Sequence, residues 1–244
     1  GRRQRQRVGP APHDAPPSDT ALAEMGPTEV VAALRAHVAV ARVAGKACER
    51  LVALCRTNDD PQAAAVAGVF EAVVEAMRAH PQVMAVQCKG CAVLAFVCKG
   101  ADAAARARVQ RAAEAGSIEA VVAAMRAHAQ SSHMQQLGCM SLVAVCIGDD
   151  AAGLARSQRA AEAGVLEALV EAMQAHPQVA RVQTFGCMAL LRVCGGGASA
   201  AARARRQRTA QAGGRTVAVA AMQAHPGDRG VQGQGQLVLN ALPA

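Results

Sequence analysis

A short phrase that ends in histidine recurs five times along the chain. Its copies begin with Leu34, Met77, Met125, Met173 and Met222 and end three residues later at His37, His80, His128, His176 and His225. Successive copies are 43, 48, 48 and 49 residues apart. A period of this length is typical of arrays in which each repeat is a small group of helices that packs only on its neighbours. We therefore expect a row of about five helical units without a single central core.

The residues before each histidine predict an amphipathic helix. In the second copy the apolar residues at helical spacing are Phe70, Val73, Val74 and Met77. Glycine recurs twelve residues before the histidine, at Gly68, Gly116, Gly164 and Gly213. Because glycine adopts the left-handed conformation without a steric penalty, we expect these residues to end a preceding helix.

A further helix is expected after each histidine. Leucine recurs fourteen residues after it, at Leu51, Leu94, Leu142, Leu190 and Leu239. Glycine occupies the tenth position after it, at Gly90, Gly138, Gly186 and Gly235. Glycine inside a helix costs about 1 kcal/mol, so we expect another helix to pass too closely here for a side chain. With the Ala- and Arg-rich segments between units, each full unit is predicted to have three helices.

Two segments of the fourth copy, residues 159–173 and 182–190, resemble armadillo repeats and are similar to the divergent armadillo segments of leucine-rich-repeat kinase-like proteins. The resemblance covers about residues 27–242. It implies an all-α fold, a right-handed α-solenoid of about five armadillo-like three-helix repeats, in which the third helices line a concave groove that binds partner proteins. At the Asn position of many armadillo repeats this chain has Ala53, Phe96, Ala144, Arg192 and Ala241. The Asn ladder that clamps peptide backbones in importin-α-like proteins is therefore absent.

The chain is expected to divide into a leader and an array. Residues 1–26 are rich in Arg and Pro, which favours a flexible leader. The array, residues 27–244, divides into the units 27–67, 68–115, 116–163, 164–212 and 213–244. In the last unit Gln236 replaces the usual Cys, so this unit is expected to be a weakened terminal cap.

Nine cysteines raise the question of metal or redox chemistry. Eight form pairs seven residues apart, as Cys91 and Cys98 do; two helical turns separate such a pair by about 10.5 Å, too far for a disulfide. We interpret them as small apolar residues of helix packing. Cys88 and Cys91 lie within one predicted helix, and the histidines are spread one per unit, so neither set predicts a metal site. No catalytic residue, metal or cofactor is predicted, and the chain is not expected to be an enzyme.

The formal net charge is +8, from 26 Lys and Arg against 18 Asp and Glu. Stacked units are expected to align nine arginines into a basic ridge: Arg106, Arg108, Arg111, Arg156, Arg159, Arg203, Arg205, Arg206 and Arg208. Positive charge favours acidic partners. Nucleic acid stays an unsupported alternative, because the chain has three Phe and no Trp or Tyr for base stacking. Every apolar run is too short to cross a bilayer, so a cytoplasmic location is expected, with the nucleus as an alternative.

If the third helices line a groove, one stripe of their residues faces a partner. The predicted groove residues are Arg42, Lys46, Lys89, Phe96, His133, Met140, Arg181, Phe185, Met188 and Arg192. We expect them to bind an acidic protein segment with one or two hydrophobic anchors, in a pocket formed by Phe96, Met140, Phe185 and Met188. Three alternatives stay open: packing of these side chains against neighbouring repeats, a regulatory arm of a larger enzyme such as a kinase, and binding of RNA or an anionic surface by the basic ridge. The sequence leaves the oligomeric state open.

Overall fold

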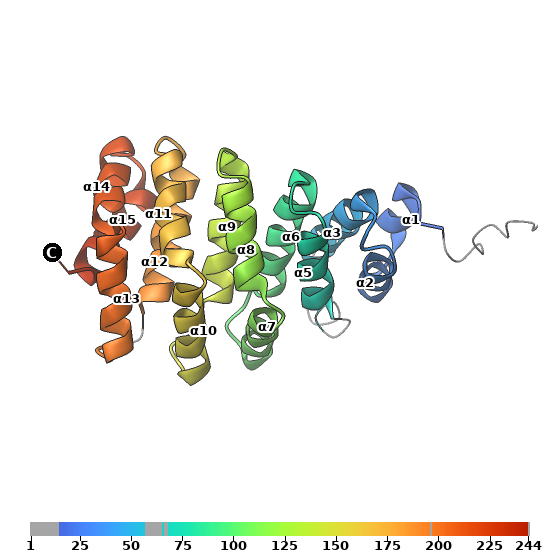
Figure 1. Cartoon of the computed structure of the whole chain (residues 1–244), viewed down its shortest axis with the longest axis horizontal. Helices are drawn as coiled ribbons and strands as arrows, with labels where there is room; N and C mark the ends of the chain where they lie inside the picture. Colours follow the sequence, from blue (N-terminus) through green and yellow to red (C-terminus); the bar gives the residue numbers. More distant parts are fainter. Residues whose placement is uncertain (1–14, 57–64, 66–67, 196, 244) are drawn as a thin grey trace, which may run out of the picture.

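The computed structural model describes residues 15–56, 65, 68–195 and 197–243. Within these ranges the chain forms fourteen α-helices and no strand, which confirms the all-α prediction. The helices follow one another in a row along the long axis of the molecule, from α1 at one end to α15 at the other (Figure 1).

Three kinds of helix repeat along this row. The helices that end before each landmark histidine, here called second helices, are α2 (Pro27–Ala36), α5 (Val69–Ala79), α8 (Ser117–Ala127), α11 (Val165–Ala175) and α14 (Gly214–Ala224). The helices that follow it, called third helices, are α3 (Ala41–Arg56), α6 (Met84–Val97), α9 (Ser132–Val145), α12 (Ala180–Cys194) and α15 (Arg229–Ala241). The Arg-rich first helices are α7 (Ala103–Glu114), α10 (Ala151–Glu162) and α13 (Ala200–Gln211). We number the units by these helices: α2–α3, α5–α6, α7–α9, α10–α12 and α13–α15.

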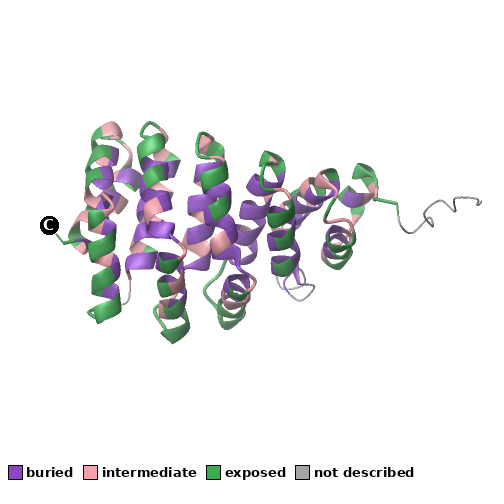
Figure 2. Ribbon diagram, in the orientation of Figure 1, coloured by how far each residue is buried: buried purple, intermediate pink, exposed green. Residues whose placement is uncertain are grey.

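The units pack through two adjoining layers. Each third helix lies against the next third helix, and each second helix lies against the third helix of its own unit and, less extensively, against its neighbouring second helices. Buried residues gather where these helices face one another, and exposed residues lie at helix ends and outer surfaces (Figure 2). The apolar core therefore runs along the row from unit to unit.

Each second helix after α2 starts at a left-handed glycine, as predicted. The backbone angle φ is 82° at Gly68, 89° at Gly116, 82° at Gly164 and 96° at Gly213. In the third, fourth and fifth units, this glycine stands between the first helix and the second helix. A residue with a Cβ atom is strained in this conformation, so glycine is required at the corner.

In the third helices after α3, the glycine ten residues after the landmark histidine makes room for methionine. A Cβ atom built at Gly138 would lie 2.5 Å from Cγ of Met125, and Gly90, Gly186 and Gly235 stand in the same relation to the methionine of their own unit. The close neighbour is thus a side chain of the second helix, and not a helix backbone. In the first unit the same two positions hold Leu34 and Ala47, both fully buried.

The C-terminus of each second helix after α2 is closed by side chains. In the third unit Gln135 donates from Nε2 to the carbonyl oxygens of Met125 at 2.8 Å and of His128 at 3.1 Å. The equivalent glutamines are Gln87, Gln183 and Gln232. His128 is the C-cap residue of α8, and its ring Nε2 donates to the carbonyl oxygen of Pro81 in the preceding unit at 2.9 Å. The landmark histidines therefore join successive units.

The predicted flexible leader is wrong for its last residues. Helix α1, Asp19–Glu24, packs against α3 at the end of the row, and Leu22 is only 1% exposed. Arg42 forms an ion pair with Asp19 and donates to the carbonyl oxygen of Pro17 at 2.8 Å. Arg50 also donates to the carbonyl oxygen of Met25, the C-cap residue of α1, at 2.9 Å. One buried apolar side chain and the contacts of two arginines thus hold this helix, and the composition of residues 1–26 does not reveal them. Residues 1–14 lie outside the described part of the chain.

Replacing Gly138 with Ala should destabilise the fold although Ala is the better helix former. The new methyl group gains about 1 kcal/mol in helix propensity, but overpacking against Met125 costs about 1–3 kcal/mol. We expect a net decrease in the free energy of unfolding, measured by chemical denaturation. Adding Met125→Leu should recover most of the loss, because the first unit accommodates Ala47 beside Leu34. A Gly138→Ala chain as stable as the original would contradict the methionine contact.

Candidate functional site

The predicted groove residues lie on four third helices, and none of them is fully buried. The exposed members are Arg42, Lys46, His133, Arg181 and Arg192. The half-buried members are Lys89, Phe96, Met140, Phe185 and Met188. These third helices thus combine charged side chains with large apolar side chains that retain exposed surface. We call the surface formed by these ten residues the third-helix face.

One hollow on this face is lined mainly by apolar side chains. Phe96 of α6 and Met140 of α9 line it together with Val143, Ala144 and Ile147, and its volume is about 340 Å³. Lys99 also lines it and supplies a positive charge. Such a hollow suits an apolar side chain of a partner.

The other two residues of the expected pocket lie one helix further along. Phe185 and Met188 belong to α12 and do not line the hollow between α6 and α9. Phe185 is half-buried and packs against the core. The hollow is lined from α6 and α9, so the four residues of the expected pocket do not converge in it.

The positive charges of the third-helix face differ in how they are neutralised. Arg42 is paired with Asp19, and Lys46 lies 3.4 Å from Glu49. Within the described residues, Arg181 and Arg192 have no ion pair. Within the described residues, the positive charge of the groove that has no ion pair therefore lies on Lys89 of α6 and on α12 rather than on α3.

Three arginines of the predicted basic ridge are buried. Arg108, Arg156 and Arg205 are 8%, 5% and 4% exposed. Arg205 donates from Nε to the carbonyl oxygen of Val193 at 2.6 Å and from Nη2 to that of Gly195 at 2.7 Å. These acceptors lie at the C-terminus of the preceding third helix, where carbonyl groups lack partners within the helix.

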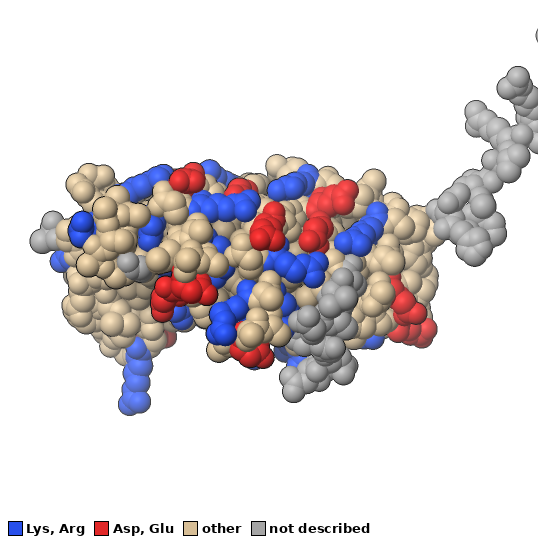
Figure 3. All heavy atoms as spheres, turned by 90° about the horizontal axis from the view of Figure 1, so that it is seen from below, with Lys and Arg blue, Asp and Glu red and all other residues tan. Residues whose placement is uncertain are grey.

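Three more ridge arginines pair with the preceding unit. Arg159 donates to both carboxylate oxygens of Glu119, at 2.6 and 3.1 Å. The pairs Arg111–Glu71, at 3.6 Å, and Arg208–Glu167, at 2.6 Å, repeat this contact. Of the nine predicted members, Arg106, Arg203 and Arg206 stay outside both groups. Positive and negative side chains alternate on the surface in Figure 3. The predicted continuous ridge is therefore wrong, because six of its arginines join the units.

Sequence reasoning missed these boundary contacts although their signal repeats. A Glu stands three residues after the left-handed glycine in three units, and an Arg stands five residues before it in the next. Gln110 and Gln158 also repeat, and their Oε1 atoms accept from Arg156 and Arg205 of the following unit at 2.8 and 3.2 Å. A Glu or Gln that recurs in one unit together with an Arg that recurs in the next unit is therefore the sequence signal for such contacts.

The cysteines are free thiols, and all but the half-buried Cys55 are buried. Burial raises the pKa of Cys48, Cys139 and Cys187 to about 12. The thiolate is the form that attacks disulfides and binds metals. These thiols stay protonated at neutral pH and are therefore unreactive. Among the described residues, no group of three or more His, Cys, Asp or Glu lies close enough to hold a metal ion.

No protein-family model, curated protein or solved structure matches this chain. The resemblance to armadillo repeats therefore stays a prediction. Within the described residues, no helix has both the length and the apolar character that a membrane span requires.

Loss of a buried boundary arginine should cost more stability than loss of an exposed one. Arg156→Ala removes a charged donor from the carbonyl oxygen of Ile147, 2.6 Å away, and we expect it to lower the free energy of unfolding by about 2 kcal/mol or more. Arg159→Ala breaks a partly exposed ion pair and should cost about 1 kcal/mol or less. Arg106→Ala serves as the exposed control. Equal losses for the three variants in urea denaturation would contradict the structural role of Arg156.

The buried thiols should make the fold sensitive to alkali. Because burial raises the thiol pKa from 9.0 to about 12, the unfolded chain releases these protons at a lower pH than the folded chain does. This stabilisation is fully present below pH 9.0 and is lost as the pH rises toward about 12. In denaturation curves measured across this range, Cys139→Ala should reduce the slope of stability against pH by about 1.4 kcal/mol per pH unit. An unchanged slope would show that Cys139 does not titrate in this way.

Proposed function

We propose that this chain is a non-catalytic protein-binding scaffold of the cytoplasm or nucleus that takes its partner along the third-helix face. The observation that carries the proposal is the hollow between α6 and α9, where Phe96 and Met140 keep part of their apolar surface exposed. Half-buried aromatic and Met side chains beside positive charge are typical of the anchoring centres of protein interfaces.

The contrast between constant packing positions and variable positions on the third-helix face supports this proposal. The Gly, Met and Gln positions are nearly constant from unit to unit, and each has a contact within the array. The positions of the third-helix face vary instead. For example, the twelfth position after the histidine is Glu49, Ala92, Met140, Met188 and Leu237 in the five units. Repeat proteins vary their binding positions in this way while the packing positions stay constant.

The partner proposed for this face is an acidic segment that carries one or two large apolar residues. Its apolar residue would enter the hollow lined by Phe96 and Met140. Its carboxylates would lie near Arg181 and Arg192, which have no ion pair among the described residues. The chain's net charge of +8 would also speed the encounter with such a segment.

A right-handed α-solenoid with a concave third-helix groove belongs to the same proposal. The third helices pack on one another more extensively than the second helices do. Closer packing in one layer favours a row that curves toward that layer. A concave third-helix face would surround an extended segment with several helices at once.

The alternatives have less support. A basic ridge for RNA or an anionic surface has lost six of nine arginines to contacts between units. A regulatory role beside a catalytic domain has no observation in its favour in this chain. Protein binding is therefore the function that we propose.

Peptides selected from a random displayed library on the whole chain should be acidic and should contain a large apolar residue. Replacing Phe96 and Met140 together with Ala should weaken their binding about tenfold or more, because anchors in hollows carry most of the binding energy. Replacing Arg181 and Arg192 together with Glu should weaken binding about as much. Fluorescence anisotropy of a labelled selected peptide gives the Kd of each variant.

The matched control is the pair Arg106→Glu and Arg126→Glu, which changes the net charge equally on helices outside the third-helix face. Equal weakening by this pair would mean that overall charge governs binding, and the proposal would fail. Circular dichroism establishes that each variant is folded. If the Ala pair unfolds, replacing Phe96 and Met140 with Gln keeps side-chain bulk but removes the apolar surface, and unchanged binding of that variant overturns the proposal.

A further inference from the structure

Each inner unit presents a defined surface, here called its forward face, to the unit that follows it. On the third unit, Glu119 and Gln110 accept hydrogen bonds from Arg159 and Arg156 of the fourth unit. The fourth unit repeats this arrangement with Glu167 and Gln158. A forward face thus offers acceptors and negative charge, and the next unit supplies two arginines.

The forward face of the fifth unit has the opposite character. Thr216 stands where the three preceding units have Glu71, Glu119 and Glu167. Arg215 stands where they have the fully buried side chains Phe70, Ile118 and Leu166. Arg206 stands where the third and fourth units bury Val109 and Ser157. One negative charge has been lost and two positive charges have been gained, so a further unit of the same kind would bring arginines against arginines.

The third helix of the fifth unit changes in the same direction. Gln236, which is exposed, stands where the other four units have buried cysteines. The exposed Asn240 stands where they have Val52, Ala95, Val143 and Leu191. The forward face of this unit therefore carries polar residues on all three of its helices, beside an exposed Val219 on α14.

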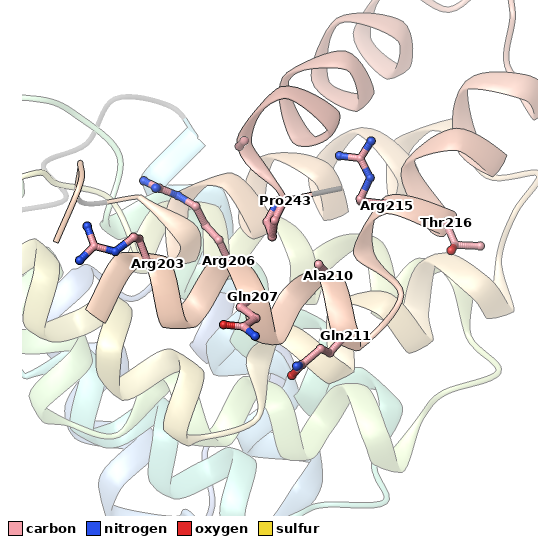
Figure 4. Close-up of a pocket in the computed structure, with 9 residues that line it drawn as sticks. Arg203, Arg206, Gln207, Ala210, Gln211, Arg215, Thr216 and Pro243 are labelled. Carbon is pink, nitrogen blue, oxygen red and sulfur yellow. The ribbon is translucent and has the colours of Figure 1, made fainter. Parts of the chain in front are cut away.

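This face contains a hollow of about 910 Å³ between α13, α14 and the end of α15 (Figure 4). Arg203, Arg206 and Arg215 line it, together with Gln207 and Gln211, and none of its lining residues is acidic. Ala210, Ala241 and Pro243 give it apolar patches. Its size suits several residues of a peptide rather than a single small ion.

The three guanidinium groups are held in place by neutral oxygens. Arg206 donates to the carbonyl oxygen of Gly197 at 2.5 Å, and Arg203 donates to that of Ala198. Arg215 donates to the carbonyl oxygens of Leu239 at 2.8 Å and Leu242 at 2.9 Å. Within the described chain none of the three forms an ion pair, so their charges are oriented but not neutralised.

The start of α14 adds to this positive potential. A helix N-terminus carries a partial positive charge that acidic residues of the first turn usually offset. The second helices α5, α8 and α11 each have a Glu in the first turn, whereas α14 has no acidic residue there. Arg215 and Thr216 belong to that first turn and line the hollow.

We propose that this hollow binds an acidic peptide segment, separately from the third-helix face. Carboxylates of the segment accept from Arg203 and Arg206, and Gln207 and Gln211 supply amide groups for its backbone. Gln207 occupies the position at which Gln110 and Gln158 accept from an Arg of the next unit. Apolar patches beside the arginines favour a peptide over nucleic acid, since the hollow has no aromatic side chain on which bases stack.

The probe is a fluorescein-labelled peptide of alternating Glu and Ala, which lacks the large apolar residue that the third-helix face requires. The matched peptide has Gln in place of every Glu. Anisotropy titration on the whole chain should show saturable binding of the Glu peptide and at least about tenfold weaker binding of the Gln peptide. Arg203→Leu combined with Arg206→Ser introduces the residues of the fourth unit, Leu154 and Ser157, and should weaken the Glu peptide about tenfold or more. Equal binding by the two peptides, or no change in this variant, overturns the proposal.

The variant Arg181→Glu with Arg192→Glu separates the two sites, because it alters only the third-helix face. Unchanged binding of the Glu peptide supports the hollow, whereas a loss limited to this variant places the peptide on the third-helix face and overturns the second site. A single-stranded RNA oligomer of equal charge is the competitor. Displacement of the peptide by RNA at lower concentration than by unlabelled peptide also overturns the proposal. If Arg203→Leu with Arg206→Ser lowers the Tm, Arg206→Gln replaces it and is read in the same way.

Discussion

The carbonyl groups at the C-terminus of a helix need donors from outside the helix. At three boundaries between units, a buried arginine of the following unit donates to carbonyl groups at the end of the preceding third helix. Arg108 donates to Val97, the last residue of α6, and Arg205 donates to Val193 and Gly195 at the end of α12. Arg156 donates to Ile147, just beyond the end of α9. A guanidinium group suits this role because it has five donors in a fixed plane and stays charged. Each of these third helices is therefore completed only when the following unit is in place. The stability of the row accordingly depends on the boundaries between units as much as on their separate cores.

The same requirement is met differently in the fifth unit. There Arg215, from the second helix of that unit, donates to Leu239 and Leu242 of its own third helix. The unit thus closes its helix without help from another first helix. The number of arginines overstates the positive charge on the surface of this chain. Many guanidinium groups donate to carbonyl oxygens or form ion pairs with Glu. Among the arginines without an ion pair in the described chain, Arg181 and Arg192 lie on the α12 part of the third-helix face, and Arg203, Arg206 and Arg215 surround the hollow of the fifth unit.

Local features could be predicted from the sequence. The helix spacing before each histidine and the left-handed glycines depend on residues within one or two turns, and the structure agrees with both. The exposure of Arg181 and Arg192 also followed from helical spacing alone. Arg156 and Arg159 lie three residues apart in the same first helix, yet Arg156 is buried and Arg159 forms a surface ion pair. Arg156 contacts Gln110 of the preceding unit, whereas Arg159 contacts Glu119. Likewise, only the stacking of α6 on α9 decides that Phe96 and Met140 share a hollow while Phe185 does not.

Because the inner units offer acceptors on one side and arginines on the other, they are nearly interchangeable. A gene duplication that inserted another copy between the third and fourth units would place matching Arg, Glu and Gln positions on both sides of the new copy. The same copy attached beyond Arg206 and Arg215 would face like charge. Selection on this interface therefore permits the array to lengthen from within and resists lengthening past the fifth unit, so the polarity of the Arg contacts sets where in the gene such growth can occur.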